Sequence, residues 1–336
     1  MATIDLTHTL SRIGFRTAND ATDRTPWHGP LLLNSALMAA LVLVSMVGMV
    51  VDDRLLLGES VWLKPAKFGL AFALYGVTLA WILRLPHRGR RATWWLGTVF
   101  AVTGVADVGF IALQAARGTF SHFNDSPDPV NEIGQLVFTS GVPGLFIANL
   151  VLAVIISWQK LADRPTRIAL KAGLWLAVTG MALGYLMGFT GPQLVRQSDG
   201  TVVGLVAGHT VRPGDTARDS AAGMPITHWS TTGGDLRIPH FVGLHGIQVL
   251  LLLTVALVAL ARRYSWLRTE TIRTALLVVA AAGYFGLLTL VVWQALRGQA
   301  LTDPDLATAG AATALAVFVA GGVAAVYLRA RESAAI

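Results

Sequence analysis

Eight long runs of apolar residues constrain this chain more than any other feature. A helix needs about 17–25 such residues to cross the roughly 30 Å hydrocarbon core of a bilayer. The composition agrees, with 54% hydrophobic and only 13% charged residues. The approximate cores of the runs are 31–51, 65–84, 93–115, 133–157, 168–190, 241–261, 274–296 and 308–328. None alternates between apolar and polar residues as barrel strands do. The pattern predicts an all-α fold, a polytopic transmembrane helix bundle of about eight spans, with the lipid bilayer as a partner.

Basic residues lie in alternate connections between these runs. The terminal segments and the connections around 84–91, 158–171 and 262–273 carry 17 of the 26 Lys and Arg residues, but only 6 of the 19 Asp and Glu residues. Because basic loops stay on the cytoplasmic side, both termini are predicted to be cytoplasmic. This placement accounts for the net charge of +7, so no nucleic acid is expected as a partner.

The chain is expected to form a single transmembrane domain over 1–336. It would have a cytoplasmic N-terminal segment, 1–30, and one long extracytoplasmic loop, 191–239, between spans five and six. The N-terminal segment has no apolar core of the signal-peptide kind, so no cleaved signal peptide is expected. A loop of this length is usually functional or without fixed structure.

Unusual polar groups gather at the outer ends of the predicted spans. They include Lys64 and Lys67 in the second span, Asp107 and Gln114 in the third, His122 after it, and Arg237, His240 and His245 at the start of the sixth. An ionisable group inside the hydrocarbon costs several kcal/mol and usually faces a cavity or a partner. The inner halves hold few comparable groups. The sequence therefore favours a polar site that opens to the extracytoplasmic side.

Asp107 lies slightly beyond the middle of the third span, toward the outside. Thr103 and Gly104 share its helix face, at i−4 and i−3. In one interpretation Asp107 pairs with Lys64, Lys67 or Arg117 to fix helix packing. In the other it is a functional carboxylate, either a proton carrier or part of a site.

Asp107, Lys67 and Arg237 are the predicted catalytic residues, with Asp107 as a proton carrier and Lys67 and Arg237 as charge partners. Lys67 begins a stripe with Ala71 and Tyr75 at helical spacing, which favours an inward-facing ammonium over one that reaches the lipid headgroups. Arg237 is expected to bind an anionic group through its planar fork, or to pair with a nearby aspartate in the loop.

Because the chain has no cysteine, any metal site must use His, Asp, Glu or Met. His122, His240 and His245 are the predicted ligands of a haem or a divalent metal. The last two are five residues apart, about 140° around a helix, so they need a third ligand from elsewhere or an unwound chain after Pro239. The alternative is one interfacial histidine and one hydrogen-bonded core histidine.

Three sequence blocks resemble those of an uncharacterised family of bacterial multi-pass integral membrane proteins. The resemblance would cover most of the chain. It implies a location in the bacterial cytoplasmic membrane and carries no activity. The blocks are Trp62-Leu-Lys64-Pro-x-Lys67-Phe68, Gln114-Ala-Ala-Arg117-Gly-x-Phe-Ser121-His122-Phe-Asn124 and Gly233-Gly-Asp235-Leu-Arg237-x-Pro-His240-Phe-x-Gly-Leu-His245-x-x-Gln248.

Two classes of function follow as hypotheses. The first is a haem- or metal-dependent membrane enzyme that acts on a small or membrane-soluble substrate at the outer site. The second is an ion- or proton-coupled transporter with Asp107 and Lys67 on its path, which would also need polar groups in the inner halves. A sensor or scaffold is a third class.

Overall fold

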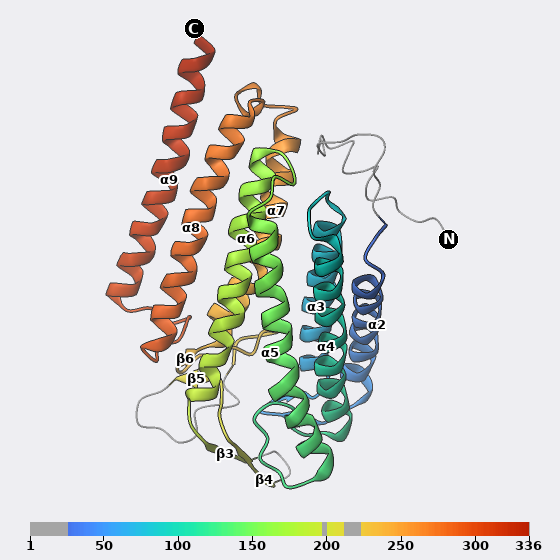
Figure 1. Ribbon diagram of the computed structural model, residues 1–336. Helices are drawn as coiled ribbons and strands as arrows, with labels where there is room; N and C mark the ends of the chain where they lie inside the picture. The colour runs from blue at the N-terminus through green and yellow to red at the C-terminus, as the bar shows by residue number, and fades with distance from the viewer. Residues whose placement is uncertain (1–25, 197–199, 212–222, 336) are drawn as a thin grey trace.

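The computed structural model describes residues 26–196, 200–211 and 223–335 and shows eight long helices side by side (Figure 1). Each helix is long and apolar enough to cross a membrane, which confirms the prediction of about eight spans. Most of the predicted N-terminal segment, 1–25, and parts of the long loop, 197–199 and 212–222, lie outside the described residues. The helices are α2 (Gly29–Val51), α3 (Leu63–Arg84), α4 (Arg90–Arg117), α5 (Pro129–Ser157), α6 (Arg164–Gly184), α7 (Arg237–Leu260), α8 (Glu270–Leu296) and α9 (Leu306–Ala335).

Local sequence signals fix the turn between α4 and α5. The Asp128 carboxylate accepts hydrogen bonds from the amides of Val130 and Asn131, at 3.1 and 3.0 Å. Pro129 occupies the first helical position, where no amide hydrogen is needed. Gly118 ends α4 in the left-handed conformation, with φ 72°, which favours glycine. The two helices are therefore held in an antiparallel pair that carries Asp107 on one member.

The helices fall into three groups across the molecule (Figure 1). On one side lie α2, α3 and α4, while α5, α6 and α7 occupy the middle. On the other side α8 packs on α7, and α9 covers α8 at the edge, with most of its own surface exposed. One large apolar core centres on Leu79, Phe100 and Leu174, and a second centres on Leu250 and Leu277. A third, small cluster (Phe110, Ile111 and Phe138) lies between α4 and α5.

Glycine allows the closest helix contact, between α6 and α7. A β-carbon on Gly180 would clash with backbone atoms of Gly243 and Leu244. In lipid, small residues let two backbones approach closely, and van der Waals packing then holds the helices together. The same device joins α8 to α9, where Gly283 lies against Val319.

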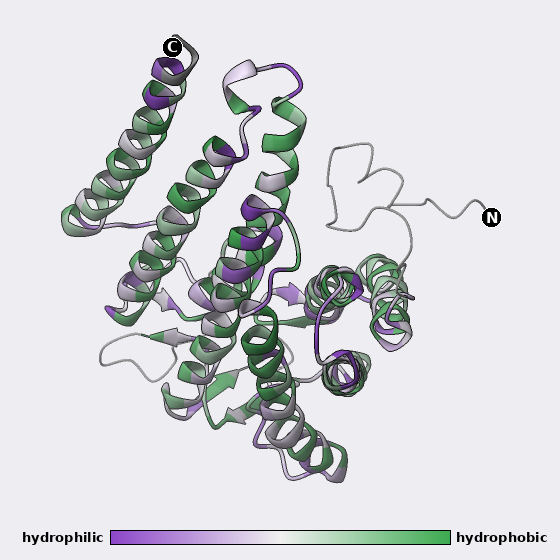
Figure 2. Cartoon of the chain, turned by 45° about the horizontal axis from the view of Figure 1, so that its top comes forward, coloured by the Kyte–Doolittle hydropathy of each residue, from purple (hydrophilic) through white to green (hydrophobic). Residues whose placement is uncertain are grey.

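The two ends of the bundle differ in charge and structure. One end carries the connections 85–89, 158–163 and 261–269, with the short η2 helix (Ser265–Leu267), and the C-terminal end of α9; we call it the basic end. The opposite end carries all the described strands, and we call it the strand-bearing end (Figure 1). Figure 2 shows hydrophilic residues mainly in these connections, with hydrophobic residues along the helices.

Short antiparallel strand pairs at the strand-bearing end depart from the all-α prediction. They are β1 (Leu55–Leu56) with β2 (Glu59–Ser60), β3 (Gln193–Arg196) with β4 (Val202–Leu205), and β5 (Thr210–Val211) with β6 (Gly234–Asp235). In the registers, Leu194 faces Gly204 and Thr210 faces Asp235. Strands of two to four residues are too short to show a period in the sequence. With the η1 helix (Tyr185–Phe189) extending α6, they give structure to much of the described part of the long loop.

Candidate functional site

Asp107 lies in the contact between α4 and α5. Its side chain is 5% exposed, and its Oδ1 would be only 2.5 Å from a β-carbon placed on Gly141. One turn along α4, the Phe110 ring fills the space left by the missing side chain of Gly134. Glycines of α5 therefore make room for large or polar side chains of α4. At position 141, any side chain would compete with the carboxylate for space.

The Asp107 carboxylate has no counter-charge within the described part of the chain. Its Oδ1 is buried and has no hydrogen-bond partner. Two of the basic residues expected as packing partners bind other acids: Lys67 pairs with Glu59 at 3.0 Å, and Arg117 pairs with Asp128 at 2.9 Å. The interpretation of Asp107 as one half of a structural ion pair therefore has no support in the contacts.

A proline weakens the turn of α5 that faces this carboxylate. Pro143 lies inside the helix, two residues after Gly141. Because proline has no amide hydrogen, the Thr139 carbonyl lacks its usual i+4 donor. In the membrane interior such a carbonyl needs another partner. The carboxylate of Asp107 thus lies next to a helix turn with spare hydrogen-bonding capacity.

Lys67 and Arg237 lie in one charged network at the strand-bearing end, and each binds an acidic residue. Lys67 Nζ donates to Glu59 Oε2 at 3.0 Å and to the Thr227 carbonyl at 3.3 Å. Arg237 donates to the fully buried Asp235 through Nε at 3.0 Å and Nη2 at 2.6 Å. Two-pronged pairs of this kind are strong and orient the guanidinium. The structure therefore brings these two predicted residues together, but their ion-pair partners are Glu59 and Asp235.

His228 links the two ion pairs, and sequence reasoning did not select it. Its Nε2 donates to the Leu57 carbonyl at 3.0 Å, and its Nδ1 lies 3.9 Å from Glu59 Oε2. Its own carbonyl accepts from Arg237 Nη2 at 2.6 Å. His228 and Ile226 both have left-handed backbones, with φ 54° and 68°. This conformation is unusual for a β-branched residue such as Ile226. The network holds this part of the loop over the starts of α3 and α7.

His122 lies among aromatic rings. Its ring centroid is 4.2 Å from that of Phe138 and 5.7 Å from that of Phe68, and its Nδ1 is 3.1 Å from the Ser121 hydroxyl. Burial in these apolar surroundings, with a smaller contribution from nearby Lys64, holds the pKa of His122 well below its usual value. The imidazole is therefore neutral near pH 7.

His240 and His245 face different neighbours. His240 Nδ1 donates to the Gly180 carbonyl of α6 at 2.7 Å. The ring of His245 is nearly parallel to that of Phe241, at 5° and 6.3 Å between centroids. Because α7 begins at Arg237, the chain is already helical at His240, and the unwinding considered after Pro239 does not occur. This arrangement agrees with a hydrogen-bonded core histidine at position 240.

The described residues contain no group of three or more His, Asp or Glu side chains that could hold a metal ion. Between His122 and α7 lie aromatic rings instead: Phe68 is 5.7 Å from His122 and 6.5 Å from Phe241, between centroids. The described donor groups, as arranged here, do not form a site of three or more ligands for a metal ion.

Buried polar side chains in the middle of the bundle escaped the sequence reasoning. The Tyr75 hydroxyl of α3 donates to Asn149 Oδ1 of α5 at 2.9 Å. Asn34 of α2 is 1% exposed, and neither polar atom of its side chain has a partner. The adjacent Ser35 hydroxyl is also unpaired. The expectation of inner halves with few polar groups was therefore incomplete, because an uncharged amide barely lowers the hydropathy of a long apolar run.

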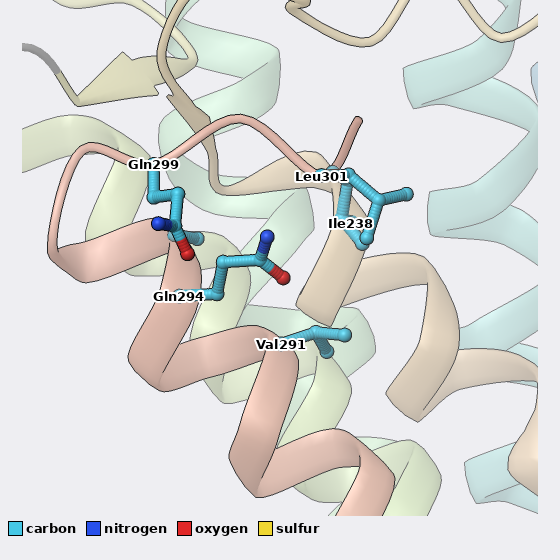
Figure 3. Close-up of a pocket in the computed structure, with 6 residues that line it drawn as sticks. Ile238, Val291, Gln294, Gln299 and Leu301 are labelled. Carbon is cyan, nitrogen blue, oxygen red and sulfur yellow. The ribbon is translucent and has the colours of Figure 1, made fainter. Parts of the chain in front are cut away.

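Two surface crevices lie away from these groups. The one beside the start of α7 leaves no room for a water molecule, and its Gln294 donates to the Ala300 carbonyl at 2.9 Å (Figure 3). The other, about 220 Å³ between α8 and α9, is mostly apolar. Neither is lined by a residue of the predicted site. The first is lined by Ile238, Val291, Gln294, Ala295, Gln299 and Leu301, and the second by Gly286, Thr289, Leu290, Trp293, Ala311 and Leu315.

Comparisons with protein families, with curated proteins and with solved structures give no match to this chain. The resemblance to a bacterial membrane-protein family gains no support from them. The eight apolar helices carry the assignment to the class of multi-pass membrane proteins.

Proposed function

We propose that this protein is an ion-coupled membrane transporter that binds and releases a proton at Asp107. The observation that carries the proposal is the burial of this carboxylate between α4 and α5 with no counter-charge among the described residues. An unpaired ionised carboxylate in an apolar interior costs several kcal/mol, whereas a protonated one costs much less. Asp107 therefore carries a proton in this conformation, and transport requires a second conformation in which the proton leaves toward the opposite side of the membrane.

The same contacts favour transport over the haem- or metal-dependent enzyme. Aromatic rings lie between His122 and α7, which carries the other two candidate ligands. Of those two, His240 is hydrogen-bonded to the backbone carbonyl of Gly180. Buried polar side chains in the inner half, notably Asn34 and Asn149, supply what a transport path needs there. The transported substrate is a small or membrane-soluble molecule.

The charge asymmetry of the loops supports an orientation with the basic end in the cytoplasm. In this orientation the charged network of Lys67 and Arg237 faces the extracytoplasmic side. The membrane is the cytoplasmic membrane of a bacterium, as the sequence resemblance implies.

A single-cysteine experiment tests the coupling of Asp107 to a conformational change. The chain has no cysteine of its own, so Thr103→Cys, one turn from Asp107, reports on that stretch of α4 without background. Its labelling by a maleimide from the basic end should differ between acidic and alkaline buffer, because protonation shifts the balance of conformations. The same cysteine in an Asp107→Asn background should show only the rise in rate with pH that ionisation of the thiol itself produces. The same pH dependence of the rate with and without Asp107 would overturn the proposal.

A further inference from the structure

We propose that, in the conformation described, Asp107 exchanges its proton with the basic end of the bundle, while Phe110 and Phe138 close the way to the strand-bearing end. The inference rests on the proposed function, since it concerns the same carboxylate. It assigns roles to residues on each side of Asp107: an aromatic barrier on one side and a polar route through Asn34, Tyr75 and Asn149 on the other.

The barrier is the small apolar cluster between α4 and α5. The rings of Phe110 and Phe138 meet edge to face, with centroids 5.2 Å apart, and the two side chains are 7% and 8% exposed. Phe110 lies one turn from Asp107 toward the strand-bearing end, and Phe138 precedes Gly141 by three residues. Beyond Phe138 lies the ring of His122, at 4.2 Å. A proton leaving Asp107 in this direction meets two aromatic rings that offer no hydrogen-bond acceptor to relay it.

Toward the basic end, the route begins at Asn34. Its Oδ1 lies 3.6 Å from the position of a β-carbon on Gly104, one turn before Asp107. Its Nδ2 lies 3.1 Å from the corresponding position at Gly76, and the Ser35 hydroxyl borders the same space. Three unpaired polar atoms therefore lie beside Gly76 and Gly104, where α2, α3 and α4 meet. The Phe72 ring lies beside Gly104 as well, 2.8 Å from its β-carbon position.

A second polar group on this side of Asp107 is the pair Tyr75 and Asn149. The Tyr75 hydroxyl donates to Asn149 Oδ1 at 2.9 Å, and Asn149 Nδ2 is buried without a partner. The Tyr75 ring stacks on Phe100, about two turns before Asp107. A buried polar atom without a partner destabilises the folded protein, so a set of them is typical of places where ordered water completes the hydrogen bonds. Side chains and water together would relay a proton along this line.

Few titratable groups face this route. Tyr75 of α3 and the buried His28, which packs against Gly97 of α4, lie on the basic side of Asp107, and His122 lies beyond Phe138 on the other side. The elements packed against Asp107 contribute Gly141 from α5, and Asn34 of α2 lies near Gly104; neither titrates. A pH response of Asp107 is therefore separable from the responses of its neighbours.

Labelling with dicyclohexylcarbodiimide tests the route. The O–H of a protonated carboxyl adds across a C=N bond of this reagent, and the acyl group then moves to nitrogen as a stable N-acylurea. The protein is reconstituted in one orientation, the pH is set separately on each side, and the adduct at Asp107 is followed by mass spectrometry. The labelling rate should follow the pH at the basic end and ignore the pH at the strand-bearing end. Asp107→Asn should give no adduct at this position.

Variants on each side of Asp107 sharpen the test. Phe138→Ala should make labelling respond to pH at the strand-bearing end as well, whereas Phe285→Ala, on the exposed side of α8, should not. Asn34→Leu should slow the response to the basic end several-fold, and Gly76→Ala, which fills the space beside Asn34, should do the same if Asn34→Leu fails to fold. Labelling that follows the strand-bearing end, or both ends equally, in the unaltered protein overturns the route but leaves the proton site intact. No adduct at Asp107 at any pH overturns the proposed function itself.

Discussion

At the residue scale, the proposed proton site depends on the fit between the Asp107 carboxylate and Gly141. Asp107 Oδ1 occupies the space that a side chain on Gly141 would need, at 2.5 Å from its β-carbon position. Glycine inside a helix normally costs about 0.5–1 kcal/mol relative to alanine. The glycine at position 141 is therefore explained by the Asp107 carboxylate that it faces, because a glycine inside α5 does not favour the helix itself.

Gly141→Ala should lower the stability of the protein by about 1–3 kcal/mol, because the carboxylate and the new methyl group overlap. The cost should largely disappear in an Asp107→Ala background, as expected for residues in direct contact. Thermal melting in detergent measures both effects. Gly109→Ala is the matched control, since nothing lies within 4 Å of its β-carbon position. Equal costs of Gly141→Ala in the two backgrounds would show that the contact is unimportant.

His122 should make the protein sensitive to mild acid. Burial holds its pKa well below the usual value, while the unfolded chain binds a proton near pH 6.5. Below about pH 6.5 the unfolded state therefore binds more protons than the folded state, so stability falls as the pH falls.

His122→Phe keeps an aromatic ring beside Phe68 and Phe138. Between about pH 7 and about pH 5, the melting temperature of this variant should fall by less than that of the unaltered protein. His87, whose pKa is also lowered by burial, contributes equally to both proteins. Asp52, whose pKa is lowered mainly by its hydrogen bond to Arg54, affects stability only at more acidic pH. Identical acid sensitivity in the two proteins would contradict the burial of a neutral His122.

At the element scale, the spans were predictable and the contacts between them were not. Runs of about twenty apolar residues identify the eight helices because a bilayer demands such lengths. The sequence also placed Asp107 inside the third span, where the structure buries it. It gave no sign that Lys67 would bind Glu59, because that pairing depends on the short turn between β1 and β2. Nor did it show that the histidines would meet Phe68 and Phe241, since contacts between helices depend on helix rotation, which a uniformly apolar run leaves open.

The crossing of α6 and α7 should tolerate no added side chain. A β-carbon on Gly180 would meet backbone atoms of Gly243 and Leu244, which cannot turn aside as a side chain can. Gly180→Ala should therefore destabilise the protein by about 1–3 kcal/mol. Gly188→Ala, with nothing within 4 Å of its β-carbon position, should be nearly neutral in the same melting experiment. Similar melting temperatures for the two variants would argue against this packing.

At the scale of the whole molecule, the orientation in the membrane determines which side supplies the proton. Ser265 at the basic end and Thr302 at the strand-bearing end are both exposed. In intact cells, a membrane-impermeant maleimide should label Thr302→Cys and leave Ser265→Cys unlabelled until the membrane is opened. The reverse pattern would invert the orientation, and with it the side from which Asp107 receives its proton.

The protonation of Asp107 is the central claim, and infrared difference spectroscopy of the reconstituted protein measures it most directly. If Asp107 is protonated, the spectrum should contain the carbonyl-stretch band of a protonated carboxyl group. The band should respond to pH and shift when the solvent is exchanged for D₂O, and it should be absent in Asp107→Asn. The shift in D₂O is expected because the proton exchanges with water through the basic end. A spectrum in which Asp107→Asn removes no protonated-carboxyl band would contradict the account, since Asp107 would then be ionised in spite of its burial.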